Sequence, residues 1–489
     1  MNVFRSQIFG QGIGFQRAQA FIGCGVFTFA SVLLAWTNAD AIPAFARKYD
    51  MDCSHCHSIS PKLNPVGDYF HDNFTFKGIG RKLPEGLQEK IRSEDPEDLH
   101  PAYWPVSFRL AGGYQFDRRD QQRAGANLQT ITTQTATLTR LELLAGGLVT
   151  EGISYYLTYY PEGANIGLPA QAALHSHPGA TAGVGQTGAV GFAWVRIADV
   201  FGQINKLNEQ NEQNEHDDKG HAHGAEGDSQ EPAHAHGFDV IFGAHELHVI
   251  NSGHHRLTNA PYLMYRYIPQ GHQTAFSLDA PQLGFGIDAA APWFGYAISV
   301  YNGTSSGADD NRVPDVFGNV EFDFGESKLG LFALRGTTPL STLAAIPGTG
   351  KDNQSFLRFG TDASVYAGPL NVLFFYAYGQ DNARLFTTSA GNPLGDPVQT
   401  AKFHGGFVEA DYLIDSSRTL LLARYDIIRN LQQGISTLPR GRNDADALTL
   451  GLRHDLALTS RVNLQLHLEA NMTQTIDHFL RKKLTSSKK

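Results

Sequence analysis

The sequence predicts an all-β protein: a transmembrane antiparallel β-barrel of about 16 strands that follows a small N-terminal α-helical domain. From residue 106 onward, segments of roughly ten residues alternate apolar and polar side chains, as barrel strands do. The chain contains 51 glycines among 489 residues, and 11% of its residues are aromatic. Rings pack well on pleated strands, and glycine allows tight reversals. A mean hydropathy of −0.26 is too low for a protein made of membrane helices.

The charge balance excludes one class of partner. Lysine and arginine number 39 and aspartate and glutamate 48, so the formal net charge is −9. A protein that binds nucleic acid normally carries a basic excess that neutralises phosphates. We therefore expect no nucleic-acid partner.

The first 41 residues have the pattern of a cleaved secretory signal peptide. Arg5 and Arg17 form a positive region, residues 20–36 an apolar core, and Ala39-Asp40-Ala41 a cleavage site of small residues. The alternative is a retained membrane anchor, but the apolar run is somewhat short for a spanning helix. We expect export and cleavage after Ala41.

The two cysteines outside the signal lie in Cys53-Ser54-His55-Cys56-His57. This C-x-x-C-H spacing is the usual signature of c-type haem attachment. Two thiols reach the two vinyl groups of one haem, and the adjacent imidazole of His57 becomes the proximal iron ligand. A structural disulfide and a thioredoxin-like redox pair are the alternatives, but neither explains the histidine. We therefore predict one covalently bound haem c in a domain of residues 42–105.

The sequence does not decide which residue is the second axial ligand of the haem iron. His71 is a candidate distal ligand on an expected helix over residues 65–74, and His100 is a more distant one. The alternative is that His71 is an ordinary surface histidine. Without a second ligand, the iron would be open to small molecules, which would favour oxygen or peroxide chemistry.

Residues 106–489 are expected to form the barrel. In the segment 462–469, Val462, Leu464, Leu466 and Leu468 alternate with polar residues. Carboxylates alternate with apolar residues in the same way at four further positions: Glu321, Asp323, Glu409 and Asp411. In a membrane barrel the apolar face meets lipid and the charged face lines the lumen. Lumen carboxylates could also attract cations, although they are ordinary in a water-filled barrel.

Loop lengths favour a membrane barrel over a soluble β-sandwich or barrel. Short connections at residues 150–152, 292–293, 326–328, 368–369, 415–417 and 459–461 alternate with long polar ones at 117–131, 161–188, 251–274, 304–315, 338–354, 381–400 and 430–443. Short turns on one side and long loops on the other are typical of bacterial outer-membrane barrels. Closure with both ends in the periplasm requires an even number of strands, hence 16.

A His-rich insertion at residues 203–237 interrupts this pattern on the short-turn side. It carries eight acidic residues and two lysines. Two His-x-His pairs, His221 with His223 and His234 with His236, are speculative ligands for a divalent metal such as Cu, Ni or Zn. The alternative is a solvated flexible tract, because nothing preorganises the histidines.

Two stretches around the haem motif resemble a known family. Ala41-Ile-Pro-Ala-Phe-Ala-Arg-Lys-Tyr49 precedes the motif, and Pro61-Lys-Leu-Asn-Pro-Val-Gly-Asp-Tyr-Phe70 follows it. They resemble the start of fused outer-membrane monohaem cytochrome-porins, which include the iron-oxidising outer-membrane cytochromes. The resemblance implies a haem at or within the barrel, bound by Cys53, Cys56 and His57, that carries electrons between an extracellular donor and periplasmic carriers.

The sequence therefore suggests an outer-membrane electron-transfer protein. We expect the donor to be Fe(II), the acceptor a periplasmic cytochrome or copper protein, and the surroundings outer-membrane lipid; Fe(II) oxidase activity is an open question. One alternative is a porin or metal-uptake channel with a structural or sensory haem. Another is a haem enzyme with peroxidase-like activity.

Overall fold

The computed structural model describes residues 52–73, 106–121, 129–150, 152–160, 189–200, 237–252, 255–269, 277–290, 293–302, 313–339, 353–386, 398–435, 444–458 and 463–476. The expected signal peptide, the His-rich insertion up to residue 236, and His100 lie outside these ranges. The domain boundary expected near residue 105 also lies outside them.

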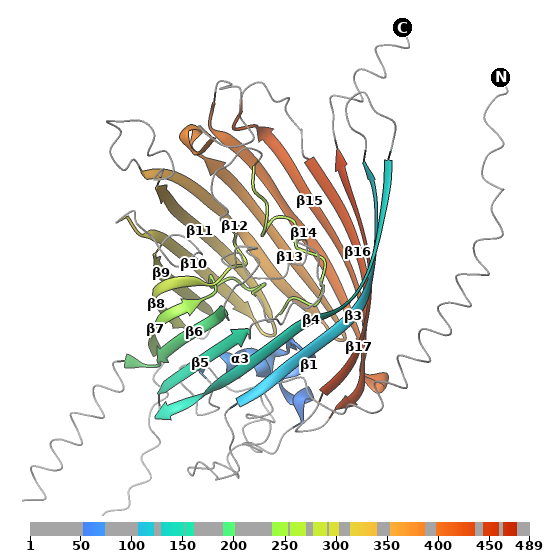
Figure 1. Cartoon of the computed structure of the whole chain (residues 1–489). Coiled ribbons are helices and arrows are strands. Elements are labelled where there is room, and N and C mark those ends of the chain that lie inside the picture. Colours follow the sequence, from blue (N-terminus) through green and yellow to red (C-terminus); the bar gives the residue numbers. More distant parts are fainter. Residues whose placement is uncertain are drawn as a thin grey trace, which may run out of the picture.

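The fold is built almost entirely from β-strands that follow one another along the chain (Figure 1). The strands of the large sheet are β3 (Val106–Gln121), β4 (Gln129–Thr150), β5 (Ile153–Tyr160), β6 (Ala189–Ile197), β7 (Gly237–His245), β8 (Gln282–Ala290), β9 (Phe294–Tyr301), β10 (Asp315–Phe324), β11 (Ser327–Pro339), β12 (Asn353–Ala367), β13 (Leu370–Asp381), β14 (Ala401–Ile414), β15 (Thr419–Gln432), β16 (Asp444–Leu458) and β17 (Asn463–Ile476).

Every strand pairs with its neighbours in sequence, so the sheet is a single antiparallel meander from β3 to β17. It curves around an interior, as Figure 1 shows. The described residues contain 15 of its strands, one fewer than expected. With 15 antiparallel strands, β3 and β17 run in the same direction. Within the described residues, these two edges do not pair with each other.

The expected alternation of side chains along the strands is confirmed. Val320 and Val408 are exposed on the convex face, whereas Glu321 and Glu409, their neighbours in sequence, are buried inside. The large apolar side chains that the convex face exposes include Ile298, Leu331, Phe359, Tyr425 and Leu468. The interior holds the strand carboxylates and guanidinium groups. The convex face of this sheet is therefore largely apolar, and its concave face combines these charged groups with buried apolar side chains.

One expected loop proves to be an internal element. The connection between β7 and β8, called the lumen segment below, comprises the described residues 246–252, 255–269 and 277–281. Part of it was expected as a long polar loop over residues 251–274. Instead, Leu257, Tyr262, Met264 and Tyr265 in this segment are all buried. The segment runs along the concave side of the sheet (Figure 1).

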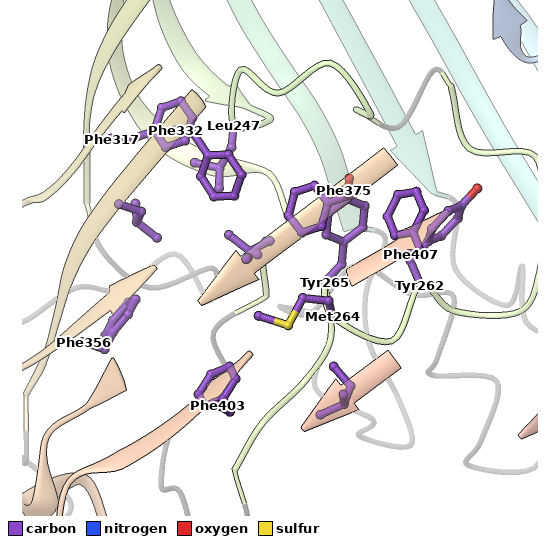
Figure 2. Packing of buried hydrophobic residues seen from close by; sticks show 14 of the residues in the cluster. Leu247, Tyr262, Met264, Tyr265, Phe317, Phe332, Phe356, Phe375, Phe403 and Phe407 are labelled. Atoms are coloured by element: carbon purple, nitrogen blue, oxygen red, sulfur yellow. The ribbon is translucent and has the colours of Figure 1, made fainter. Parts of the chain in front are cut away.

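Aromatic packing holds the lumen segment in place, as Figure 2 shows. The ring centroids of Tyr265 and Phe375 lie 4.6 Å apart, and those of Tyr262 and Phe407 lie 4.7 Å apart. Both contacts are edge-on, a favourable geometry for aromatic pairs. Phe375 and Phe407 face inward from β13 and β14, where they are neighbours in register. The apolar core is therefore inside the curved sheet, in the space where an open pore would have water.

The N-terminal segment, residues 52–73, also lies inside the curve, near the short-turn end (Figure 1). It contains η1 (Cys53–His55), β1 (His57–Ile59), β2 (Lys62–Leu63) and α3 (Pro65–Asn73). The helix α3 confirms the one expected over residues 65–74. Of the helices that the structure describes, none has the length and apolarity to cross a membrane.

Candidate functional site

Cys53, Cys56 and His57 lie together on η1 and the start of β1. The backbone amide of Cys56 donates to Cys53 O at 3.2 Å, so one tight turn brings the two cysteines to the same end of the segment. No disulfide joins them. Burial raises the pKa of Cys53 to about 11 and that of Cys56 to about 12. A thioredoxin-like redox pair needs a lowered cysteine pKa, so this environment does not suit one.

His57 has one ring nitrogen fixed by the backbone. Its Nδ1 lies 3.0 Å from Pro61 O. A carbonyl oxygen can only accept, so Nδ1 donates its hydrogen and the Nε2 atom of the neutral ring carries a lone pair. Burial lowers the pKa of His57 to about 4, although the Pro61 carbonyl opposes this shift. A neutral imidazole with Nδ1 bonded to a carbonyl is the usual form of a metal-ligating histidine.

Hydrogen bonds of the Asn64 side chain hold the turn that follows the motif. The Asn64 side chain donates from Nδ2 to His55 O at 3.0 Å and accepts at Oδ1 from the Gly67 amide at 2.9 Å. A Cβ atom on Gly67 would lie 2.0 Å from Cys56 O, so the helix α3 approaches the motif too closely for any side chain there. Asn64 and Gly67 thus set the position of α3 against the cysteine turn.

A buried ion pair attaches the N-terminal segment to the sheet. Lys62, only 1% exposed, forms an ion pair with Asp411 on β14, and its Nζ donates to Asn371 Oδ1 on β13 at 2.6 Å. Asn371 and Asp411 are partners in register across the two strands. A buried ammonium group is tolerated only where it is paired and hydrogen-bonded. Asp411 and Asn371 therefore form a specific binding site for the Lys62 ammonium group on the wall.

Arg453 on β16 connects the N-terminal segment with the lumen segment. Its guanidinium donates from Nη1 to Ser60 O at 3.1 Å and from Nε to Leu257 O at 2.9 Å. Beside it, Ile59 is 0% exposed and belongs to an apolar cluster with Leu257 and Leu420. The two internal segments and the wall thus form one packed unit.

The other predicted site residue of this segment, His71, lies on the last turn of α3. It lines a cavity of about 130 Å³ together with Asp68, His245 and His255, whereas none of the three motif residues lines it. The Asp68 carboxylate pairs with His255 Nε2 at 3.1 Å. Nothing in the described residues brings His71 to His57, so its role as distal ligand stays a prediction.

Of the strand carboxylates expected to line a water-filled lumen, Asp411 and Glu409 bind the internal segments, whereas Glu321 pairs within the wall. Glu409, which is 0% exposed, accepts from the Tyr262 hydroxyl at 2.8 Å. Asp362 accepts from the Ile250 amide at 2.6 Å. Glu321 pairs with Lys328 at 3.1 Å on the neighbouring strand. These carboxylates therefore have protein partners, which sequence alternation alone does not reveal.

The donor set at residues 53–57 fits a c-type haem. Two thiols and an imidazole with an available Nε2 lone pair come from one short turn, and the imidazole is oriented by a carbonyl. The sequence does not predict which residues attach this turn to the wall, because no local pattern marks long-range partners. These residues are Lys62, Asn371 and Arg453.

The divalent-metal site predicted in the His-rich insertion lies outside the described residues. Its four candidate ligands are His221, His223, His234 and His236. Within the described part of the chain, no group of three or more His, Cys, Asp or Glu is placed to hold a metal ion. Metal binding by His221, His223, His234 and His236 therefore stays a prediction from the sequence alone.

Comparisons with known proteins give only a coarse likeness. No family model matches the chain, and no curated protein matches it. Among solved structures it is similar to OmpF of Salmonella typhi in complex with daunomycin, with a TM-score of 0.41 and 8% identity over 76% of this chain and 97% of that one. It is also similar to an anion-selective porin from Comamonas acidovorans, with a TM-score of 0.40 and 12% identity over 76% of this chain and 90% of that one. For the outer-membrane channel DcaP of Acinetobacter baumannii, the TM-score is 0.39 and the identity 10% over 76% of this chain and 97% of that one.

Proposed function

We propose that this protein is an outer-membrane electron-transfer cytochrome with a filled barrel. One haem c would be bound through Cys53, Cys56 and His57, and electrons would pass from an extracellular donor, Fe(II) first among the candidates, to a periplasmic cytochrome or copper protein. A haem bound there supplies a one-electron iron couple. The observation that carries the proposal is the hydrogen bond from His57 Nδ1 to Pro61 O, which leaves Nε2 as the ligating atom.

The chain's own residues would hold and insulate this centre. The Lys62–Asp411 pair and the Arg453 bonds keep the motif against the wall. The aromatic packing of the lumen segment fills part of the interior with apolar side chains. The exposed apolar side chains on the convex face suit lipid, so the motif would lie at the short-turn, periplasmic end of a membrane-embedded barrel.

The filled interior favours electron transfer over the channel alternative. Tyr262, Tyr265, Phe375 and Phe407 occupy interior space that a solute channel would keep open. Conductance in planar bilayers separates the two functions. We expect the purified protein to show no porin-like open state, and a large steady conductance would support the channel instead.

The haem assignment and the donor are tested separately. Detergent-purified protein should give a pyridine haemochrome spectrum with one haem per chain, and Cys53→Ala or Cys56→Ala should disturb it. Fe(II) should then reduce the haem, as followed by absorbance. A protein without haem overturns the whole proposal. A haem that Fe(II) does not reduce overturns only the choice of donor, and a panel of other donors then follows.

A further inference from the structure

We propose that Asp411 on β14 is a positioning residue for His57, so that the barrel wall sets the orientation of the imidazole. This inference rests on the proposed haem function. Asp411 does not touch the imidazole. It acts through Lys62 and through the carbonyl of Pro61, the residue that precedes Lys62 in the chain.

The first step runs from the wall to the lysine. Lys62 Nζ is held by the Asp411 carboxylate and by Asn371 Oδ1 at 2.6 Å, and all three side chains are buried. Asn371 is itself fixed, because its Nδ2 donates to Ser364 Oγ on β12 at 2.9 Å. A free lysine side chain adopts many conformations because it has several rotatable bonds. The contacts with Asp411 and Asn371 restrict Lys62 to one of them.

The second step runs from the lysine to the imidazole. Residues 57–59 and 62–63 form a two-stranded pair in which His57 lies opposite Leu63 and Ile59 opposite Lys62. Pro61 lies in the reversal between these strands, and its carbonyl accepts the His57 Nδ1 hydrogen at 3.0 Å. Fixing Lys62 therefore fixes the acceptor that orients the ring. A second wall contact, from Arg453 Nη1 to Ser60 O at 3.1 Å, restrains the other side of the reversal.

The consequence is a dependence of the haem on a strand residue far along the chain. A carbonyl partner on Nδ1 makes the imidazole a stronger electron donor to iron. Stronger donation stabilises the oxidised iron and lowers the midpoint potential. If the Lys62–Asp411 ion pair is removed, the Pro61 carbonyl is no longer fixed, and the midpoint potential of the haem should rise.

The test uses the double variant Lys62→Met/Asp411→Asn. The single variant Asp411→Asn leaves a buried ammonium group without its carboxylate and is expected to destabilise the fold. The double variant removes the pair as a neutral unit, so it is expected to fold and to leave the net charge unchanged. The matched control is Arg358→Met/Asp381→Asn, which removes another buried ion pair, with 2.5 Å between Arg358 Nη1 and Asp381 Oδ1. Asp381 lies at the opposite end of β13 from Asn371.

We expect the double variant to bind haem with a midpoint potential shifted to a more positive value, while the control keeps the wild-type potential. In the haem-free background Cys53→Ala/Cys56→Ala, the amides of residues 57–63 should exchange hydrogen faster in the double variant only. An unchanged potential or unchanged exchange overturns this inference and leaves the proposed function standing. A wild-type protein without haem overturns both.

Discussion

The carboxylate of Asp68 and the imidazole of His255 meet at 3.1 Å, from Oδ1 to Nε2, and thereby join α3 to the lumen segment. Both side chains line the internal cavity. The two internal segments thus touch through a polar contact as well as through the apolar contact of Ile59 with Leu257.

Breaking this contact should loosen both segments together. We expect Asp68→Leu and His255→Phe each to lower the free energy of local opening by about 1–3 kcal/mol, because each removes the contact and leaves a largely buried polar partner behind. Amide hydrogen exchange of residues 65–71 and 255–259 measures the effect. The double variant should cost less than the sum of the singles. Additive losses would show that the two residues do not interact. Asp415→Asn, at an 85% exposed side chain, is the control.

The close approach at Gly67 should make alanine damaging there. A Cβ atom would lie 2.0 Å from the backbone oxygen of Cys56, and a backbone atom cannot move aside as a flexible side chain can. We expect Gly67→Ala to destabilise the N-terminal segment by about 1–3 kcal/mol and to lower the haem content per chain. The control is Gly113→Ala on β3, where a Cβ would meet nothing within 4 Å. Equal haem content in the two variants would contradict the packing described for α3.

The convex face provides a test of membrane insertion. Leu331 on β11 is 51% exposed, so in a soluble protein Leu331→Arg would change stability very little. In a membrane barrel the same change places a charge in the hydrocarbon and should cost roughly 2–4 kcal/mol near the midplane. We expect Leu331→Arg to reduce insertion into lipid vesicles, and Ser416→Arg in the β14–β15 turn to leave it intact. Insertion of both variants at the wild-type level would favour a soluble barrel.

Acid should release the lumen segment near β8. Burial alone would raise the pKa of Asp279, but the guanidinium groups of Arg256 and Arg266 hold it below the usual value of 3.8. Because the pKa in the folded state is the lower one, Asp279 stabilises the fold above pH 3.8, and this contribution is lost as the pH falls further. Near-ultraviolet circular dichroism of the packed tyrosines, recorded during melting, should show this decline.

Asp279→Asn provides the comparison. It should lower the stability at neutral pH by about 1–3 kcal/mol, since it removes hydrogen bonds to charged partners. It should also show a smaller decline than the wild type below pH 3.8. The same acid profile in both proteins would show that Asp279 is not the group responsible.

Local patterns predicted the strands well. Two-residue alternation placed Val320 and Val408 outside and Glu321 and Glu409 inside, and the short turn expected at residues 368–369 lies between β12 and β13. The helix expected over residues 65–74 is α3. These features follow from backbone periodicity and turn chemistry, which neighbouring residues determine.

Local patterns could not predict what fills the interior. Residues 251–274 contain Asn, His and Gly as a surface loop would, yet Tyr262 and Tyr265 pack against Phe407 and Phe375 from distant strands. The partners of Lys62 lie more than 300 positions away, with sequence separations of 309 and 349. Alternation identifies Asp411 as an inward carboxylate, but it does not reveal the cation that Asp411 meets.

The wall contacts of the N-terminal segment also impose an order on biogenesis. Asn371, Asp411 and Arg453 lie on β13, β14 and β16, which are synthesised late. The N-terminal segment, residues 52–73, can reach its final place only after those strands have paired, and contacts so distant in sequence form slowly. Attachment of the proposed haem to Cys53 and Cys56 would therefore fall in the interval before the curved sheet encloses this segment.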